Sequence, residues 1–119
     1  MIVAFASKDG VNINEHFGWS QTFYLYEIKG DEYTLIKEVD SSKELEDESD
    51  KLTYKIECLE NANILYVLQI GPKAATMVKS AGIMPLKSAN ENETIEGVLA
   101  KIIELKNTNP PIWMRRFLS

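Results

Sequence analysis

The segment NILYVLQIGPKAATMVKSAGIMPLK, residues 63–87, decides the class of fold. Its first part, up to Gly71, is nearly all apolar, which is typical of a central strand that is covered on both faces. A proline at the first helical position and an alanine-rich stretch follow, and Gly82 ends this helix. Residues 83–88 then form a short strand, which Pro85 marks as an edge strand. A strand, a helix and a second strand in this order predict a parallel crossover in an α/β sheet.

The residues before this segment predict an antiparallel part of the same sheet. Residues 2–7, IVAFAS, form a short apolar run that ends in a turn at Asp9 and Gly10. Residues 22–28, TFYLYEI, are rich in aromatic side chains, and the turn KGDE leads into a third strand at 33–39. Because a short hairpin joins them, the second and third strands should be antiparallel.

The rest of the chain predicts one acidic connection and two amphipathic helices. Residues 40–50 are polar and acidic and are expected to form a solvated loop, with docking on a basic partner as the alternative. Residues 51–62 predict a helix, because apolar side chains recur on one face at Leu52, Ile56 and Leu59. Residues 93–106 predict the last helix, with an inward face made of Ile95, Val98, Leu99, Ile102 and Leu105.

Together these elements predict the order β-β-β-α-β-α-β-α in a single domain that spans residues 1–119. The expected fold is an α/β fold, a five-stranded mixed sheet with helices packed on it, which is compatible with the ribonuclease-H-like architecture. Nucleases of that architecture hold metal ions with carboxylates on their central strands. The strands at 2–7 and 63–71 contain no Asp or Glu, so we expect no enzymatic activity of this kind.

The composition argues against several other classes of protein. A formal net charge of −5 does not suit a nucleic-acid-binding protein, whose affinity depends on Lys and Arg side chains that neutralise phosphates. The single cysteine, Cys58, excludes an internal disulfide and any CxxC cage for zinc or an iron–sulfur cluster. No stretch is long and apolar enough to span a membrane, and the first residues lack the basic start of a signal peptide. We therefore expect a cytoplasmic protein with no membrane partner.

The only histidine, His16, lies in the segment VNINEHFGWSQ, residues 11–21. Asn12, Asn14 and Gly18 favour turns, so this segment should leave the sheet at the end of the first strand. Open α/β sheets place their ligands outside the strand ends, and a neutral imidazole there can bind a metal such as iron. The residues by themselves leave two interpretations open, a metal ligand or a turn histidine whose ring is hydrogen-bonded to the backbone.

Two other chemistries have weaker support in the sequence. A Cys–His hydrolase would need contact between Cys58 and His16, and no spacing places them together. The segment GPKAATMVKSAG lacks the GK[ST] ending of a phosphate-binding loop. The free N–H groups of a helix that begins after Gly71 would nevertheless suit an anion.

Three stretches carry a resemblance to a known family. The opening, IVAFASKDG followed by VNINEHFGWSQTFYLYEI, resembles the start of the dinitrogenase iron–molybdenum cofactor-binding family, with its strand, DG turn, HFG segment and aromatic strand. The stretch ILYVLQIGPKAATMVKSAGIMPLK is similar to the later block of the same family. The tail NPPIWMRRFL is similar to the ending of the nitrogen-fixation member of that family. The resemblance covers almost the whole chain.

The resemblance implies a ribonuclease-H-like domain that binds iron–molybdenum cofactor or its iron–sulfur precursor and is not a nuclease. It also implies that the partners are the nitrogenase cofactor-assembly proteins that donate and accept the cluster. The alternative is a related escort or regulatory protein-interaction module, for example a vanadium-nitrogenase member. The histidine of the family's HFG segment corresponds to His16, and the glycine after the fourth strand corresponds to Gly71.

The expected cofactor-binding residues on this basis are His16, Phe17, Gly18, Asn14, Gly71 and Lys8. The expected metal ligands are His16 and Cys58, although the family's cysteine usually lies near the position of Ala62. Phe17 is expected to shield the imidazole from water, and Trp19 is a candidate wall of the site. Lys8 and Lys73 would offset the negative charge of a bound cluster.

Overall fold

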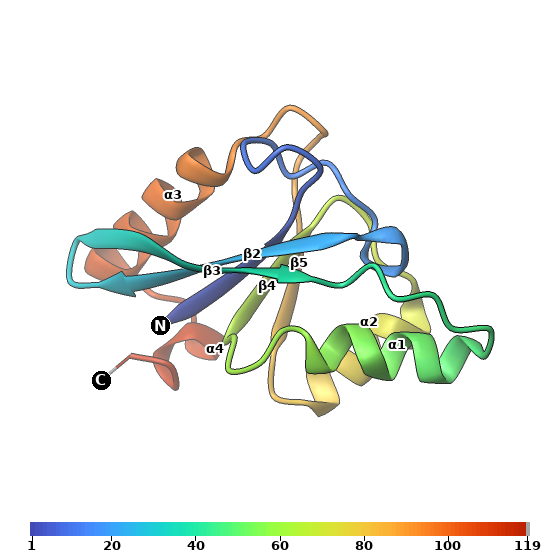
Figure 1. Cartoon of the computed structure of the whole chain (residues 1–119). Coiled ribbons are helices and arrows are strands. Elements are labelled where there is room, and N and C mark those ends of the chain that lie inside the picture. Colours follow the sequence, from blue (N-terminus) through green and yellow to red (C-terminus); the bar gives the residue numbers. More distant parts are fainter. Residues whose placement is uncertain (119) are drawn as a thin grey trace.

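Five strands form one mixed sheet in the computed structural model, which describes residues 1–118 (Figure 1). The strands are β1 (Ile2–Ala6), β2 (Thr22–Lys29), β3 (Glu32–Asp40), β4 (Ile64–Val67) and β5 (Met84–Lys87). Their order across the sheet is β3-β2-β1-β4-β5. The β1–β2 and β2–β3 pairs are antiparallel, whereas β1–β4 and β4–β5 are parallel. The predicted ribonuclease-H-like α/β fold is confirmed, and β5 is an edge strand as its proline indicated.

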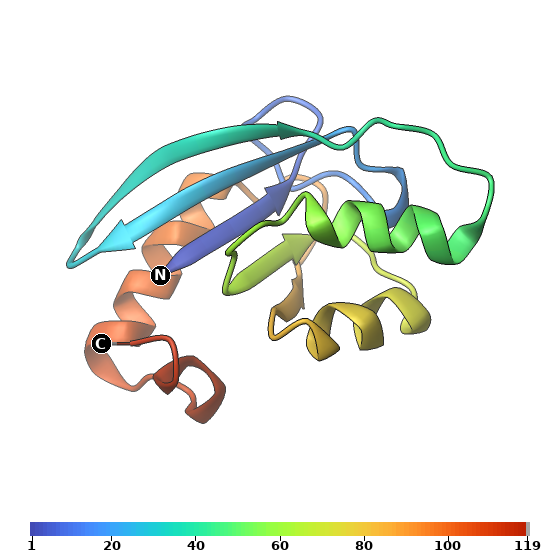
Figure 2. The same ribbon diagram turned by 60° about the horizontal axis from the view of Figure 1, so that its bottom comes forward.

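Helices cover both faces of this sheet. They are α1 (Glu48–Glu57), α2 (Pro72–Ser80), α3 (Ile95–Thr108) and α4 (Ile112–Arg115), together with the short 3₁₀ helix η1 (Phe17–Trp19). Helices α1 and α2 lie side by side on one face, and α3 lies on the opposite face (Figures 1 and 2). Across residues 1–118, every helix is too short or too polar to cross a lipid bilayer.

Several element bounds differ from the sequence-based expectation: α1 ends at Glu57 rather than at residue 62, and β4 is limited to Ile64–Val67 within the predicted 63–71. Helix α1 begins at Glu48, inside the predicted acidic loop at 40–50, because the Asp47 carboxylate accepts a hydrogen bond from the Asp50 backbone N–H and caps the helix. The one-turn helix α4 was not predicted; it begins after Pro111, and its buried Met114 packs into the core below α3.

Alternate side chains of β1 enter two separate apolar layers, as the pleat of a strand requires. Ala4 and Ala6 face the layer under α1 and α2, which also contains Phe17, Phe23, Leu52, Leu65 and Val78. Val3 and Phe5 face the layer under α3, which also contains Ile13, Ile64, Ile95, Leu99 and Ile102. The central strands are therefore buried on both faces.

The last turn of α3 departs from the predicted inward face. Leu105 is 42% exposed, so its expected burial is wrong. This turn of the helix contacts the β2–β3 turn through polar groups, because the Lys106 ammonium donates to the Gly30 carbonyl and the Asn107 amide donates to Asp31 Oδ1 at 2.6 Å. The last turn of α3 is therefore fixed to the β2–β3 turn by polar groups.

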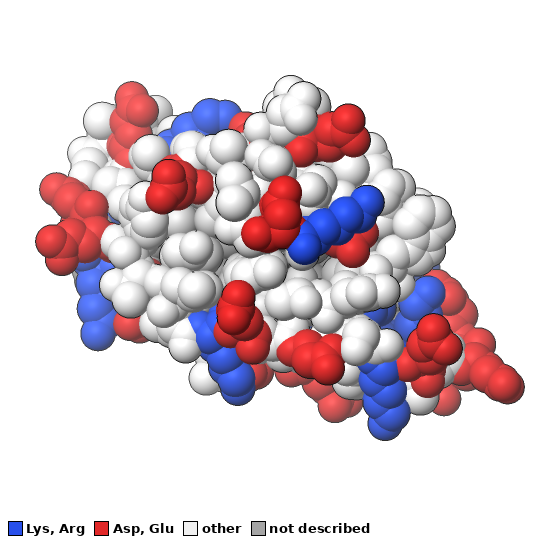
Figure 3. Space-filling view, turned by 45° about the horizontal axis from the view of Figure 1, so that its top comes forward, with Lys and Arg blue, Asp and Glu red and all other residues white. Residues whose placement is uncertain are grey.

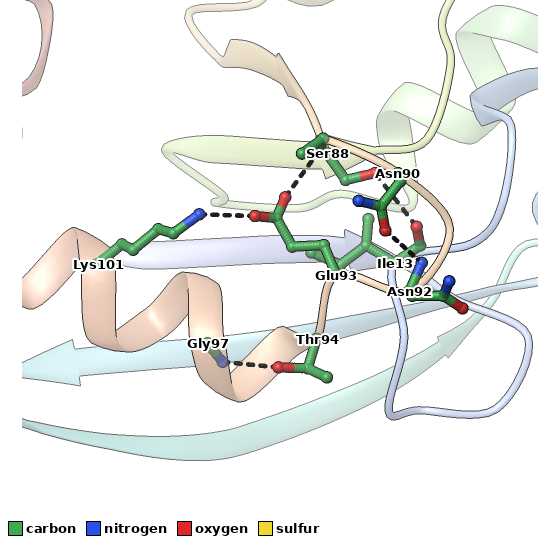
Figure 4. A network of polar contacts seen from close by, with 9 residues as sticks. Ile13, Ser88, Asn90, Asn92, Glu93, Thr94, Gly97 and Lys101 are labelled. Carbon is green, nitrogen blue, oxygen red and sulfur yellow. Dashed lines mark hydrogen bonds and ion pairs between the residues drawn. The ribbon is translucent and has the colours of Figure 1, made fainter.

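Polar contacts at the start of α3 hold the segment that follows β1 (Figure 4). The Glu93 carboxylate accepts hydrogen bonds from the Ala89 backbone N–H at 2.9 Å and from the Lys101 ammonium at 2.7 Å. The Glu93 carbonyl in turn accepts from the Ile13 N–H at 2.9 Å. The chain after β1 is thus tied to the N-terminal end of α3.

The turn directly after β1 should make the stability of the fold vary with pH in the acid range. The Asp9 carboxylate accepts the backbone N–H groups of Asn12 and Val11, each at 2.9 Å, and these bonds lower the Asp9 pKa from 3.8 to about 2. Because this pKa is lower in the folded state, the stabilisation is present above pH 3.8 and is lost as the pH falls through about 2. In urea unfolding, the stability difference between the parent and Asp9→Ala should shrink from about pH 5 to pH 2. A difference that stays constant over that range would contradict this assignment.

Candidate functional site

The chain that carries His16 crosses the C-terminal end of β4. The Leu68 N–H donates to the Glu15 carbonyl, and the Phe17 N–H donates to the Gln69 carbonyl, both at 2.9 Å. His16 itself forms an isolated parallel bridge with Gln69. Together with the contacts at the start of α3, these bonds fix the segment at both ends. The single imidazole is therefore held at the edge of the sheet where α/β folds place their ligands.

A hollow of about 210 Å³ lies beside His16. Its lining combines η1 with the chain that leads from β4 into α2, namely His16, Phe17, Gly18, Trp19, Gln69, Ile70 and Gly71. The imidazole stacks on the Trp19 indole, with ring centroids 4.8 Å apart and ring planes 22° apart. Gly71 is the N-cap residue of α2, so the positive end of that helix borders the hollow. The structure thus brings together His16, Phe17, Gly18 and Gly71 from the expected set.

The imidazole of His16 has no hydrogen-bond partner within residues 1–118. His16 is the N-cap residue of η1, but its side chain makes no hydrogen bond that caps this helix. The interpretation as a turn histidine bonded to the backbone is therefore wrong for the described part of the chain. Both ring nitrogens remain available to an external ligand, and one face of the ring is covered by Trp19.

Phe17 is among the residues that line the hollow, but its side chain is part of the buried core. Phe17 is 0% exposed and packs under α1 and α2, with its ring centroid 5.8 Å from that of Phe23. Side chains three residues apart eclipse each other in a 3₁₀ helix, which explains why Trp19 stacks on His16 while Phe17 points into the core. The 69% exposed Trp19 is the residue that shields the imidazole.

Asn14 and Lys8 lie in the preceding turn and do not line the hollow. The Asn14 Oδ1 accepts a hydrogen bond from the Lys8 backbone N–H at 2.8 Å, so this side chain stabilises the turn. The Lys8 side chain is exposed. Lys73, on the first turn of α2, donates to Ser49 Oγ at 2.8 Å and joins α2 to the start of α1. These residues shape the surroundings of His16 without contacting it.

The structure does not bring Cys58 into the hollow. Cys58 is the C-cap residue of α1 and is half-buried, with its Sγ 3.8 Å from the Asp40 carbonyl oxygen. It faces the end of β3, because the helical face with Leu52 packs on the sheet and Cys58 lies on the flank. The contact with His16 that a Cys–His hydrolase requires is absent from residues 1–118.

The ligand set for a metal is correspondingly small. Nowhere in the described residues do three His, Cys, Asp or Glu side chains converge. The strands β1 and β4 carry no carboxylate. A metal that bound at the hollow would therefore take a single imidazole nitrogen from this chain and its other ligands from elsewhere. This arrangement suits a preassembled cluster better than a bare ion.

Sequence reasoning missed two polar residues near His16. Glu15 is buried beside the histidine, and burial raises the pKa of its carboxyl group. Gln69 holds the backbone of the His16 segment, as described above. A buried acid directly before a histidine has no local sequence signal, because only the tertiary packing turns Glu15 inward. The pairing of His16 with Trp19, in contrast, could have been read from their spacing in a 3₁₀ turn.

The charge on the surface is mixed. The face drawn in Figure 3 shows acidic and basic side chains interspersed among uncharged ones, without a continuous basic patch. Nucleic-acid binding needs Lys and Arg side chains that gather on one surface. This face does not have that feature.

Comparisons with known proteins agree with the family resemblance described in the sequence analysis. The family model described as dinitrogenase iron-molybdenum cofactor matches residues 1–105. NifX of Sinorhizobium fredii is 31% identical over 125 positions, which cover 98% of this chain and 77% of that protein. NifX of Herbaspirillum seropedicae is 32% identical, and the match covers 98% of this chain and 80% of that protein. NifY of Azotobacter vinelandii is 30% identical over 96% of this chain, but this match covers 46% of NifY.

Solved structures share the fold. The crystal structure of PH0822 superimposes with a TM-score of 0.67 at 24% identity, over 87% of this chain and 89% of that chain. A dinitrogenase-like protein of Methanocaldococcus jannaschii gives a TM-score of 0.62 at 20% identity, over 87% of this chain and 88% of that chain. At these identities the likeness shows the architecture, a mixed sheet with helices packed on it.

Proposed function

Because the chain belongs to the dinitrogenase iron-molybdenum cofactor family, we propose that it binds iron–molybdenum cofactor or its iron–sulfur precursor and carries it during nitrogenase cofactor assembly. The proposed partners are the assembly proteins that donate and accept the cluster in the cytoplasm. Residues 1–119 would act as one domain, and the protein would not be an enzyme. Its similarity to proteins named NifX and NifY supports this role.

The observation that carries the proposal is the free imidazole of His16 beside a hollow at the sheet edge. A cluster carrier must release its cargo, and a cluster held by four thiolates on one chain would not exchange readily. A single imidazole bond can be replaced by a ligand from the accepting protein. The small ligand set of the described residues therefore supports transport over permanent cofactor binding.

The electrostatics of the hollow support an anionic cargo in spite of the net charge of −5. Gly71 caps α2, whose first-turn N–H groups lack partners within the helix and carry partial positive charge. Lys73 extends from the same turn toward the start of α1. A local field of this kind acts directly on a ligand in the hollow, whereas salt screens exposed carboxylates that are farther away than a Debye length of about 8 Å.

Anaerobic chromatography tests this proposal. Purified protein would be mixed with isolated iron–molybdenum cofactor, or separately with its precursor, and passed over a size-exclusion column. We expect the brown colour and the iron to elute with the protein, and to move to an accepting apo-protein when that is added. Cofactor that elutes entirely apart from the protein in both mixtures would overturn the proposal.

An escort or regulatory module of the same family, of the vanadium-nitrogenase or NifY-like kind, is the alternative, and the similarity to NifY favours it. An escort would bind a cluster-free nitrogenase protein, whereas a carrier would bind the cluster itself. Repeating the chromatography with the cluster-free nitrogenase protein in place of the cluster separates the two functions.

The fold also leads to a prediction about nuclease activity. Because β1 and β4 lack carboxylates, the protein should not cleave an RNA–DNA hybrid in the presence of Mg²⁺ or Mn²⁺. The measurement is gel electrophoresis of a labelled hybrid, with a ribonuclease H as positive control. Cleavage that follows the protein through a second purification would contradict this prediction.

A further inference from the structure

A second cavity, of about 520 Å³, shares only Gly18 and Trp19 with the hollow beside His16. Its walls come from η1 and the two residues after it, from the loop between β3 and α1, and from Lys51 and Lys55 of α1. That loop runs along the outer end of α1 at the right of Figures 1 and 2. A volume of this size lies within the range of about 300–1,000 Å³ that small-molecule sites occupy.

A buried lysine lines this cavity. Lys55 is 4% exposed, and its ammonium donates to the Ser20 carbonyl at 2.6 Å and to the Ser41 carbonyl at 2.7 Å. An ammonium has three N–H donors, and these two bonds are the ones that it makes within residues 1–118. No carboxylate of the described residues forms an ion pair with it. Burying a charge without a counter-ion costs free energy, which an anion in the cavity would offset.

A second cation faces the same space. Lys51 lies one helical turn before Lys55 on α1, and side chains four residues apart share a helix face. A Cβ placed on Gly18 would lie 4.0 Å from the Lys51 Nζ, so this ammonium lies close to the backbone of η1. Burial is the main cause that lowers the pKa of Lys55, and the positive charge of Lys51 is the next. The two ammonium groups are therefore close enough to repel each other.

Burial and the charge of Lys51 lower the pKa of Lys55 by more than two carboxylates outside the lining of the cavity, the buried Glu15 and the exposed Asp40, raise it. Glu44 and Glu46 line the cavity from the loop between β3 and α1, but both are exposed. Exposed charges are screened by water and salt, whereas the buried Lys55 is screened much less. The inner end of the cavity is therefore positive although its rim is acidic.

We propose that this cavity binds a small oxyanion with two negative charges, such as inorganic phosphate or a dicarboxylate, between Lys51 and Lys55. The Lys55 ammonium would give its third hydrogen bond to one oxygen, and Lys51 would face the second charge. Trp19 borders the cavity, so its fluorescence should change when the anion binds. This site does not depend on the cluster-binding proposal, because neither lysine lines the hollow beside His16.

Fluorescence titration tests the site without any cluster. The chain has two tryptophans, so a Trp113→Phe background leaves Trp19 as the only reporter. Phosphate, malonate and acetate would be titrated at constant ionic strength, held with sodium chloride. We expect a saturable change with phosphate or malonate, and binding of singly charged acetate that is weaker by about tenfold. The tighter of the two dianions identifies whether the site takes a phosphate or a carboxylate ligand.

Three lysine variants separate a built site from a general effect of charge. In the same background, Lys51→Met should weaken dianion binding about tenfold and Lys55→Met should remove it. Lys79→Met, an exposed lysine on α2 outside the cavity, should bind like the parent. If Lys55→Met does not fold, as judged by circular dichroism, the comparison of Lys51→Met with Lys79→Met decides. An unsaturable change with both dianions, or equal binding by these two variants, would overturn the proposal.

Discussion

His16→Ala is expected to weaken binding of iron–molybdenum cofactor by at least about tenfold, which corresponds to ~1.4 kcal/mol, and to leave the stability of the fold almost unchanged. The substitution removes the imidazole that borders the hollow. Its cost to folding should be small, because the ring makes no hydrogen bond within the described residues and stacks only on the exposed Trp19. Anaerobic cluster titration and thermal melting, measured on the same preparation, give the two quantities.

Cys58→Ser is the matched control for this substitution, because Cys58 is the other residue that was expected to bind metal. Its Sγ faces the Asp40 carbonyl outside the hollow, so this variant should keep most of the cluster affinity of the parent. Equal affinity of His16→Ala and the parent would show that the ligand assignment is wrong. Loss of binding in Cys58→Ser, with an intact circular dichroism spectrum, would show that the thiol is a ligand.

In contrast to His16→Ala, Phe17→Ala should destabilise the fold, by about 3–5 kcal/mol. The Phe17 ring is completely buried between the sheet and helices α1 and α2, where it contacts Phe23. Truncation leaves a cavity that rigid strands and helices fill only in part. Thermal unfolding should show a melting temperature that is lower by more than about 10 °C.

Trp19→Ala is the control for the loss of a large aromatic ring from the same turn. Because Trp19 is 69% exposed, its removal should change the stability by no more than about 0.5 kcal/mol. Similar melting temperatures for the Phe17 and Trp19 variants would contradict the orientation of η1. Below its melting temperature, Phe17→Ala should still bind the cluster, since its side chain does not form the metal contact.

Much of this architecture could be predicted from local patterns. Apolar runs and turn residues identified each strand, since a buried strand needs continuous apolar side chains and a hairpin needs residues that turn the chain. Pro72 and Gly82 marked the ends of α2, because proline suits the first helical turn and Gly82 adopts a positive φ of 85° after it. The predicted inward face of α3 failed only at Leu105, which is 42% exposed in the turn of the helix that makes polar contacts with the β2–β3 turn.

The sequence by itself also determined that the chain has one imidazole and one thiol, and that the imidazole follows the first strand. Only the tertiary structure decided which residues surround it. Gly71 reaches His16 because β1 and β4 are parallel neighbours whose C-terminal ends meet at one edge. Trp19 stacks on the imidazole, and Phe17 does not, because the 3₁₀ turn aligns side chains three residues apart. Lys55 is buried because α1 packs it against carbonyl groups from two distant turns, and such contacts between remote segments leave no pattern in the local sequence.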